Sequence, residues 1–337
     1  MTRSPRLSER VRPLTAADDP VAEFFAAHRA GDRVSLGTSG TSGTARSVVR
    51  TTESWVSSFA PVASLTGLRP ASRVWLPGPL SATMNLFAAV HAAAVGAALV
   101  DRPEDATHAH LTPAALARHL SPALSGVDVV VAGDRLAPAL HERAVTAGAR
   151  VHHYYGAAEL SFVAWGGHAE NLRPFPGVEV AIRDGVVWAR SPYLCTGYDG
   201  PPGPLRRDAE GFATVGDRAA LEDGRLFVHG RDDAVTTGGA TVATADVELV
   251  LRAAATGEVV VVGLPHPELG AVLAAVLTTP RDHPSVRAAA ARSLQGADRP
   301  RLWFQVTDLP LTAAGKVDRA ALVSLLSGAD GRAHRLV

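Results

Sequence analysis

A run of glycine and hydroxyl side chains near the start of the chain constrains the fold more than any other feature. Val34, Ser35 and Leu36 predict a short strand, and residues 38–46 follow it as Thr-Ser-Gly-Thr-Ser-Gly-Thr-Ala-Arg. Backbone N–H groups exposed at glycine, with hydroxyls and a terminal cation, can surround the phosphates of a nucleotide. A Ser/Gly linker has a similar composition, but the strand before the loop and a helix-like segment after it favour a phosphate-binding loop.

The same loop excludes one large class of nucleotide-binding proteins. The chain contains no Gly-x-x-x-x-Gly-Lys-Ser/Thr motif, which argues against a P-loop ATPase or kinase. Basic and acidic residues number 33 each, so no net charge attracts nucleic acid or an anionic membrane. The sequence therefore predicts another ATP-using class, in which a local arrangement of groups holds the phosphates.

Hydrophobic periodicity predicts a layered α/β protein with a β subdomain and a small α+β domain at the C-terminus. After an N-terminal extension, residues 1–33, helices alternate with buried strands. From Gly177 short strands are broken by Gly and Pro, which indicates a mainly β subdomain within a large domain, residues 34–230. Residues 231–337 form the predicted C-terminal domain. With 47% hydrophobic residues, 337 residues can bury cores for all of these parts.

The boundaries of the expected elements follow from the apolar spacing. The expected helices are residues 55–65, 82–98, 137–147, 247–254, 286–294 and 318–326. The expected strands are residues 34–36, 127–132, 150–154, 178–182, 186–189, 259–262, 272–277 and 302–306, with a hairpin at residues 219–228.

Cysteine content and apolar runs bear on the location of the protein. Cys195 is the single cysteine, so no intrachain disulfide can form, and a reducing, cytoplasmic setting fits best. The N-terminus is basic but lacks the apolar run of a signal peptide. Residues 86–100 are too short for a membrane span of about 20 residues and contain His91, so we expect a buried helix and no membrane insertion.

Four motifs in a fixed order resemble those of the adenylate-forming superfamily, which includes acyl-CoA synthetases, adenylation domains of peptide synthetases and luciferase. They are residues 38–46, 155–159, 216–217 with 230–233, and 310–319. The second motif reads Tyr-Gly-Ala-Ala-Glu and is similar to the family's Tyr-Gly-x-Thr-Glu. The last one matches Pro-x-Thr-x-x-Gly-Lys-x-x-Arg. The chain resembles the shortened members of this superfamily, including bacterial o-succinylbenzoate–CoA ligases.

The resemblance implies an activity and its cofactors. Enzymes of this superfamily use ATP and Mg²⁺ to convert a carboxylic acid into an acyl-adenylate with release of pyrophosphate. The acyl-CoA synthetases then transfer the acyl group to coenzyme A, so the expected substrate is a small-molecule carboxylic acid. Two alternatives stay open: transfer of the acyl group to an amine or a carrier protein, and a degenerate nucleotide-binding homologue.

Roles for nucleotide-binding residues carry over where the motifs match. Glu159 would ligate the Mg²⁺ that bridges the ATP phosphates, because this hard cation prefers oxygen ligands. Tyr155, followed by Gly156, would offer a flat face to adenine. Asp217 would accept hydrogen bonds from the ribose hydroxyls, and Arg231 would contact the same ribose. The phosphates would lie against Thr38, Ser39, Gly40, Thr41, Ser42, Gly43 and Thr44.

Two cations join Glu159 as expected catalytic groups. Lys316 would reach the substrate carboxylate and the α-phosphate, stabilising the charge that develops as pyrophosphate leaves. The chain has very few lysines, so a lysine within this motif is less readily explained as a surface residue. Arg46 closes the phosphate loop where relatives have lysine, which keeps the charge and changes the geometry. The family's domain rotation would have its hinge at Asp232 or Asp233.

The chain departs from the family pattern in two further ways. Only 33 residues precede the strand at Val34, so the long N-terminal subdomain of most relatives is expected to be missing. Ala158 replaces the threonine of the second motif and removes a hydroxyl that would contact the α-phosphate. A hydrogen bond to a charged group is worth about 1.5–3 kcal/mol, so we expect activity to be reduced but not lost.

The acyl pocket is expected to be apolar. Its predicted walls, residues 76–85 and 160–163, carry no charged group, which favours an aliphatic or aromatic monocarboxylic acid over an amino acid or o-succinylbenzoate. Core packing would place the same residues there. The histidines lack the spacing of a catalytic metal site and are expected on the surface or in the core.

Overall fold

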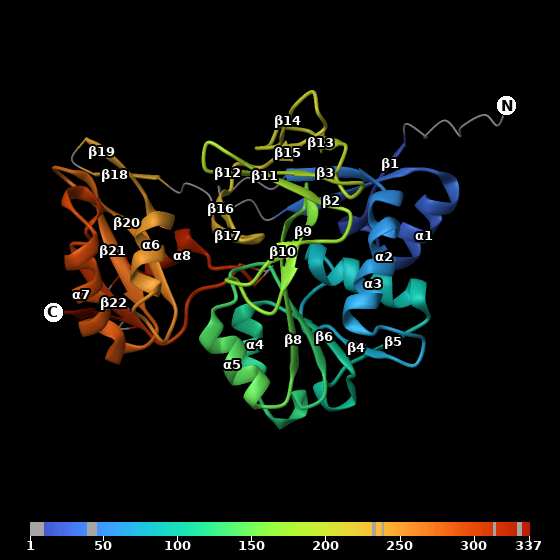
Figure 1. The fold of residues 1–337 in the computed structure, drawn as a ribbon, viewed down its shortest axis with the longest axis horizontal. Coiled ribbons are helices and arrows are strands. Elements are labelled where there is room, and N and C mark those ends of the chain that lie inside the picture. Colours follow the sequence, from blue (N-terminus) through green and yellow to red (C-terminus); the bar gives the residue numbers. More distant parts are fainter. Residues whose placement is uncertain (1–9, 39–45, 231–233, 238, 313–314, 329–331) are drawn as a thin grey trace. The chain divides into compact units, whose positions relative to one another are not determined.

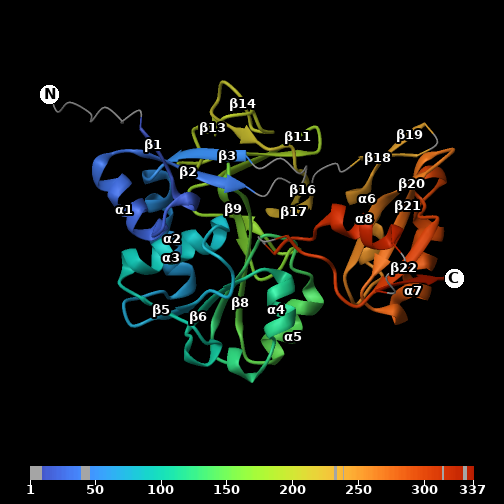
Figure 2. The same ribbon diagram turned by 180° about the vertical axis from the view of Figure 1, so that it is seen from behind.

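The chain forms two compact units. The computed structural model describes residues 10–38, 46–230, 234–237, 239–312, 315–328 and 332–337. The first unit comprises Met1–Val228 with Ala313–Lys316, and the second comprises His229–Thr312 with Val317–Val337. Figures 1 and 2 show the fold of each unit from opposite sides.

A seven-stranded sheet organises the first unit (Figure 1). Its order is β10-β9-β8-β7-β6-β4-β5. The strands are β4 (Arg73–Trp75), β5 (Ala98–Val100), β6 (His108–Leu111), β7 (Asp128–Val131), β8 (Arg150–Ala157), β9 (Ser161–Gly166) and β10 (Arg173–Pro174). Strands β4 to β8 pair in parallel, while β9 and β10 continue the sheet antiparallel. The parallel part, with its crossover helices, confirms the predicted α/β body.

Helices cover both faces of this sheet. They are α1 (Pro20–Ala30), α2 (Glu53–Thr66), α3 (Thr83–Val95), α4 (Pro113–His119) and α5 (Pro138–Thr146). Val130 of β7 shares a core with Trp55 and Phe87 of α2 and α3. Its neighbours Val129 and Val131 share another core with residues of α4 and α5. Alternate residues of a strand point to opposite faces, so β7 is buried on both sides.

Two smaller sheets complete the first unit. One has the order β1-β2-β3-β13, and the other the order β14-β15-β12-β16-β17, with β11 paired to β12. These strands are β1 (Val11–Pro13), β2 (Arg33–Thr38), β3 (Arg46–Thr51), β11 (Glu179–Arg183), β12 (Val186–Arg190), β13 (Gly197–Asp199), β14 (Arg206–Arg207), β15 (Ala213–Thr214), β16 (Arg218–Glu222) and β17 (Arg225–Gly230). The predicted β subdomain is thereby confirmed.

The segment after the phosphate loop differs from the expectation. It is not helix-like: β3 pairs antiparallel with β2 and with β13, and α2 begins only at Glu53. Val48 and Val49 of β3 are buried, which explains why this short apolar stretch is extended. The loop thus connects the two strands of a hairpin.

The second unit is a six-stranded sheet covered by helices on both faces. Its strands are β18 (Ala234–Thr237), β19 (Ala240–Ala243), β20 (Val259–His266), β21 (Gly270–Leu277), β22 (Leu302–Val306) and β23 (Ala333–Leu336), and its helices are α6 (Thr244–Arg252), α7 (His283–Ser293) and α8 (Arg319–Ser327). Val259 and Val261 join the core under α6 and α7, whereas Val260 and Val262 join the core under α8. This matches the predicted α+β character of the region.

The apolar segment 86–100 is divided between two elements. Helix α3 ends at Val95, and Gly96 takes the left-handed conformation, φ 83°, that commonly ends helices. The chain then enters β5. No helix in the described parts of the chain has the length and apolar character to cross a membrane. Single-turn 3-10 helices are η1 (Leu14–Ala16), η2 (Pro103–Asp105), η3 (Pro122–Leu124), η4 (Pro280–Asp282) and η5 (Gly296–Asp298).

Candidate active site

The second motif lies where β8 ends and turns into β9. Parallel sheets of α/β proteins hold ligands at the carboxyl ends of their strands, and Tyr155 and Gly156 occupy such an end. The pairing register shifts between these two residues. A Cβ added at Gly156 would lie 2.1 Å from the carbonyl oxygen of Ser161. Glycine is therefore required here for the close approach of two backbones, whatever it contacts in a nucleotide.

Glu159 lies in the turn between β8 and β9, and its side chain is buried. The residue is 6% exposed, and its Oε1 accepts a hydrogen bond of 2.8 Å from the hydroxyl of Tyr198. Its backbone oxygen accepts a hydrogen bond of 2.8 Å from Cys195 N. Among the described residues, Oε2 has no hydrogen-bond partner. A buried carboxylate with one oxygen available fits a Mg²⁺ ligand and not a surface residue that opens a helix.

A magnesium site of this kind needs little from the protein. Mg²⁺ keeps several waters and binds through one or two carboxylates together with substrate phosphates. The described residues hold no group of three or more His, Cys, Asp or Glu side chains that could bind a metal by themselves. Glu159 is thus the carboxylate that fits this role.

Arg50 is a buried cation beneath the same turn, and the sequence reasoning missed it. It is 0% exposed, its Nη2 donates a hydrogen bond of 2.7 Å to Ala158 O, and its guanidinium lies 5.5 Å from the centre of the Trp55 ring. Nε and Nη1 have no hydrogen-bond partner in the part of the chain that the structure describes. Burial lowers the pKa of Arg50 to about 10, against the opposing influence of Cys195 and Glu159. Arg50 is therefore charged at neutral pH.

Tyr155 and Asp217 meet although 62 positions separate them. The Tyr155 hydroxyl donates a hydrogen bond of 2.7 Å to Oδ2 of Asp217, which is 8% exposed. Gly216 precedes this aspartate with φ 86°, and its N–H donates to Oγ1 of Thr214. The structure thus brings together the residue expected to face adenine and the residue expected to bind ribose.

Other predicted site residues are placed only in part. Thr38 ends β2 and Arg46 begins β3, and the two residues pair across the hairpin. Lys316 is the only lysine of the chain. It follows Gly315, which has φ 75°. A Cβ added at Gly315 would lie 2.8 Å from Cγ2 of Thr112. Thr112, Gly315 and Lys316 all belong to the first unit. Outside the described residues lie Ser39, Gly40, Thr41, Ser42, Gly43, Thr44, Arg231, Asp232 and Asp233.

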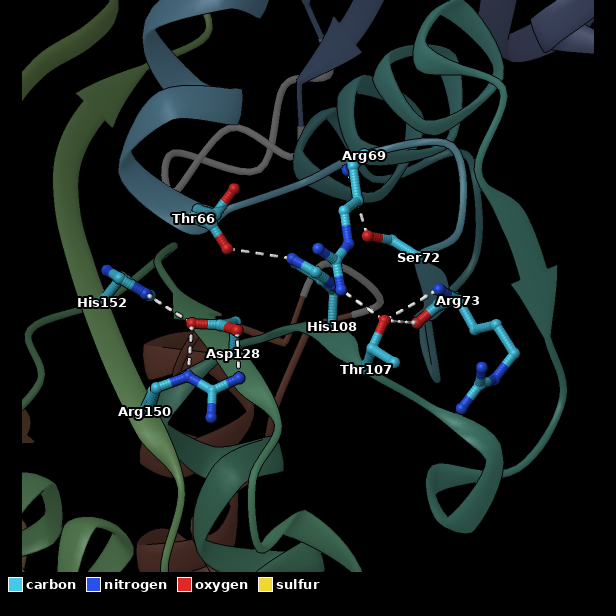
Figure 3. A network of polar contacts seen from close by, with 9 residues as sticks. All are labelled: Thr66, Arg69, Ser72, Arg73, Thr107, His108, Asp128, Arg150 and His152. Atoms are coloured by element: carbon cyan, nitrogen blue, oxygen red, sulfur yellow. Dashed lines mark hydrogen bonds and ion pairs between the residues drawn. The ribbon is translucent and has the colours of Figure 1, made fainter.

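A polar network at the other end of the parallel strands has a structural role (Figure 3). Arg150 donates two hydrogen bonds to Asp128, 3.0 Å to Oδ1 and 2.5 Å to Oδ2, and His152 lies 3.2 Å from Oδ1. Burial raises the pKa of Asp128, but the hydrogen bonds from Arg150 and His152 outweigh it and leave the pKa below its usual value. Arg150 and Asp128 begin β8 and β7, so the network joins the amino ends of neighbouring strands, away from the motif.

Three buried histidines belong to the core of the first unit. Burial lowers the pKa of His91 to about 4, of His110 to about 3 and of His153 to about 4. Nε2 of His91 and Nδ1 of His110 have no hydrogen-bond partner. These histidines are therefore neutral at physiological pH.

The expected walls of the acyl pocket include buried residues. Leu160, Phe162 and Val163 all belong to the main core of the first unit. Asn85 donates a hydrogen bond of 3.1 Å from Nδ2 to Pro79 O, and its Oδ1 is buried without a partner. Core packing thus accounts for the apolar character of residues 160–163, as the sequence allowed.

Comparisons with known proteins agree with this fold. The AMP-binding enzyme family matches residues 36–198. A probable 2-succinylbenzoate–CoA ligase of Mycobacterium tuberculosis is 31% identical over 292 residues, which cover 82% of this chain and 75% of that protein. A structure of an Escherichia coli MenE variant with bound OSB-AMS is 28% identical, with a TM-score of 0.72, over 87% of this chain and 68% of that one.

An amide bond synthetase, McbA from Marinactinospora thermotolerans, is also similar. Its structure is 27% identical with a TM-score of 0.69, over 87% of this chain and 69% of that chain. The fold is that of the adenylate-forming enzymes. The chain belongs to the AMP-binding enzyme family: the family matches residues 36–198, and the M. tuberculosis relative is similar over 82% of the chain.

Proposed function

We propose that the protein is an AMP-forming carboxylate–CoA ligase. It activates a carboxylic acid with ATP, releases pyrophosphate and transfers the acyl group from the adenylate to coenzyme A. The observation that carries the proposal is the arrangement of Glu159, Tyr155 and Asp217 around the end of β8, in a chain of the AMP-binding enzyme family. The names of the M. tuberculosis relative and related ligases support coenzyme A as the acceptor.

Each residue of the site has a part in adenylation. Glu159 would hold Mg²⁺, and the bound ion would offset the charge of the ATP phosphates. The carboxylate of Asp217 binds the ribose hydroxyls, with Tyr155 fixing its Oδ2. The hairpin loop from Thr38 to Arg46 surrounds the phosphates.

Lys316 stabilises the transition state of the first half-reaction. Its ammonium group lies against the substrate carboxylate and α-phosphate, where negative charge develops as pyrophosphate leaves. Arg231 adds a contact to the ribose at the start of the C-terminal region. Ala158 supplies no hydroxyl to the α-phosphate, so the first half-reaction lacks one hydrogen bond that family members with threonine make.

The test is pyrophosphate exchange into ATP, measured with a panel of carboxylic acids. We expect exchange that depends on one class of acid, with apolar monocarboxylic acids foremost, and thioester formation when coenzyme A is added. Absence of exchange with every acid would indicate a nucleotide-binding homologue without turnover. Asp217→Asn is the matched variant, because it keeps the shape of the side chain and removes the charge that binds ribose.

A second acceptor deserves the same assay because McbA, a similar structure, is named an amide bond synthetase. Exchange without consumption of coenzyme A would point to an amine or a carrier protein as the acceptor. Simple amines are then added after adenylation, and amide is detected by mass spectrometry. Formation of the amide distinguishes an amine acceptor from a carrier protein.

A further inference from the structure

A pocket in the second unit is lined by arginine. It encloses about 590 Å³ against α7, β22, β23 and residues 299–301 before β22. Arg287, Arg299, Arg301 and Arg335 line it, and no aspartate or glutamate among the described residues does. Trp303, which is 7% exposed, forms part of the apolar wall. Small-molecule sites typically enclose about 300–1,000 Å³, so the pocket has a suitable size.

Among the described residues, no acidic side chain pairs with the arginines of this pocket. Elsewhere in the second unit, Arg252 and Arg319 pair with Glu248 at 2.8 and 2.7 Å. By contrast, Arg287, Arg301 and Arg335 form neither an ion pair nor a side-chain hydrogen bond with any described residue. Leu336 and Val337 also line the pocket and add apolar surface to its wall.

Arg299 helps to fix the pocket wall, which leaves the other three arginines available to a ligand. Nη2 of Arg299 donates hydrogen bonds to two backbone oxygens, 2.9 Å to Ala291 O and 3.0 Å to Leu294 O. The ring of His283 lies 5.5 Å from that of Trp303, and its buried Nε2 has no hydrogen-bond partner. A fixed guanidinium and an unpaired imidazole nitrogen are thus both present at or beside the pocket.

We propose that this pocket binds a small molecule carrying two or more phosphate groups. Guanidinium groups match phosphate oxygens in pairs of parallel hydrogen bonds, and four of them in one pocket favour an anion with several negative charges. Like charges within about 8 Å repel one another at physiological ionic strength, and a multivalent anion relieves that repulsion. A concave pocket on a chain with balanced charge does not suit a nucleic acid, which needs an extended basic surface.

The pocket shares no residue with the proposed adenylation site. None of the lining residues belongs to the four motifs, so loss of the pocket leaves the groups of the adenylation chemistry in place. Ligand binding at the pocket must therefore be measured by a signal from the pocket itself and not by adenylation activity. Trp303 offers one, since its indole N–H gives a separate NMR signal among five tryptophans, assigned with Trp303→Phe.

The experiment titrates the full chain with tripolyphosphate and, in parallel, with ADP, in about 100 mM salt. We expect a saturable shift of the Trp303 signal with at least one probe. A stronger response to ADP indicates that the apolar wall recognises a nucleoside, and a stronger response to tripolyphosphate indicates recognition of phosphate alone. Replacing Arg287, Arg301 and Arg335 by serine should weaken this binding by at least about tenfold.

The matched control removes the same charge elsewhere. Arg118, Arg281 and Arg292 are exposed and do not line the pocket, so their triple serine variant should bind the probe as the native chain does. Thermal unfolding checks that both variants fold. The proposal is overturned if neither probe shifts the Trp303 signal, if both variants lose binding equally, or if sulfate at equal ionic strength binds as tightly.

Discussion

Arg50→Met separates the effect of Arg50 on activity from its effect on stability. The substitution removes a hydrogen bond from a charged donor to Ala158 O, worth about 1.5–3 kcal/mol, and a desolvated contact with Trp55 worth up to about 2 kcal/mol. It also removes two buried donors, Nε and Nη1, which cost about 1–3 kcal/mol each while they lack partners.

These opposing terms are of similar size, about 3 kcal/mol for the lost contacts and about 4 kcal/mol for the unpaired donors at their centres. Methionine fills much of the same volume without a charge, so we expect the free energy of unfolding in urea to change by less than about 2 kcal/mol. The rate of pyrophosphate exchange should nevertheless fall by about 10-fold to 100-fold. Arg50 holds the turn that carries Glu159, and small displacements of a catalytic group have effects of this size.

Arg50→Lys is the control for the charge. Lysine keeps a buried cation but cannot reproduce the guanidinium geometry toward Ala158, so we expect it to be less stable than the methionine variant. The reasoning is refuted if Arg50→Met lowers the free energy of unfolding by more than about 3 kcal/mol. It is equally refuted if that variant exchanges pyrophosphate at the native rate.

Three further predictions concern the proposed site and the buried histidines. Tyr198→Phe removes the hydrogen bond to Oε1 of Glu159. The Mg²⁺ concentration for half-maximal exchange should rise, with little change in ATP affinity. An unchanged Mg²⁺ dependence would contradict the role of Tyr198 in holding the Glu159 carboxylate. Lys316→Ala should abolish exchange while nucleotide binding, measured by calorimetry, persists; normal exchange would remove Lys316 from the mechanism. Burial lowers the pKa of His110 to about 3, whereas the pKa of histidine in the unfolded chain is about 6.5. Below pH 6.5 the unfolded chain therefore binds more protons than the folded one. The stability contributed by neutral His110 is complete above pH 6.5 and falls on acidification toward pH 4, by up to about 1.4 kcal/mol per pH unit. In His110→Leu the dependence of urea unfolding on pH over this range should be shallower, and an unchanged slope would show that the histidine is not buried in neutral form.

Local patterns predicted most elements because burial imposes periodicity on neighbouring residues. The helix expected at residues 137–147 is α5, and the strands expected at residues 259–262 and 272–277 are β20 and β21. The hairpin strand β3 escaped prediction, since only Val48 and Val49 are strongly apolar in it and its pairing partners lie elsewhere in the chain.

The site needed more than local pattern. Arg50 and Ala158 are 108 positions apart, and nothing in either segment indicates that they meet. The one sequence signal for Arg50 is its place directly after two apolar residues in a short extended segment. The signal is weak, because an arginine in such a position faces solvent in most proteins. Tyr198 lies outside every motif, so its hydrogen bond to Glu159 could come only from the folded chain.

The presence of a single lysine makes the proposed catalytic group chemically unique. Among 33 basic residues, Lys316 carries the only side-chain amine. An amine-directed covalent reagent therefore reports on Lys316 through one additional mass increment. Protection of that increment by ATP and acid would give a direct footprint of substrate occupancy, without any mutation and without turnover.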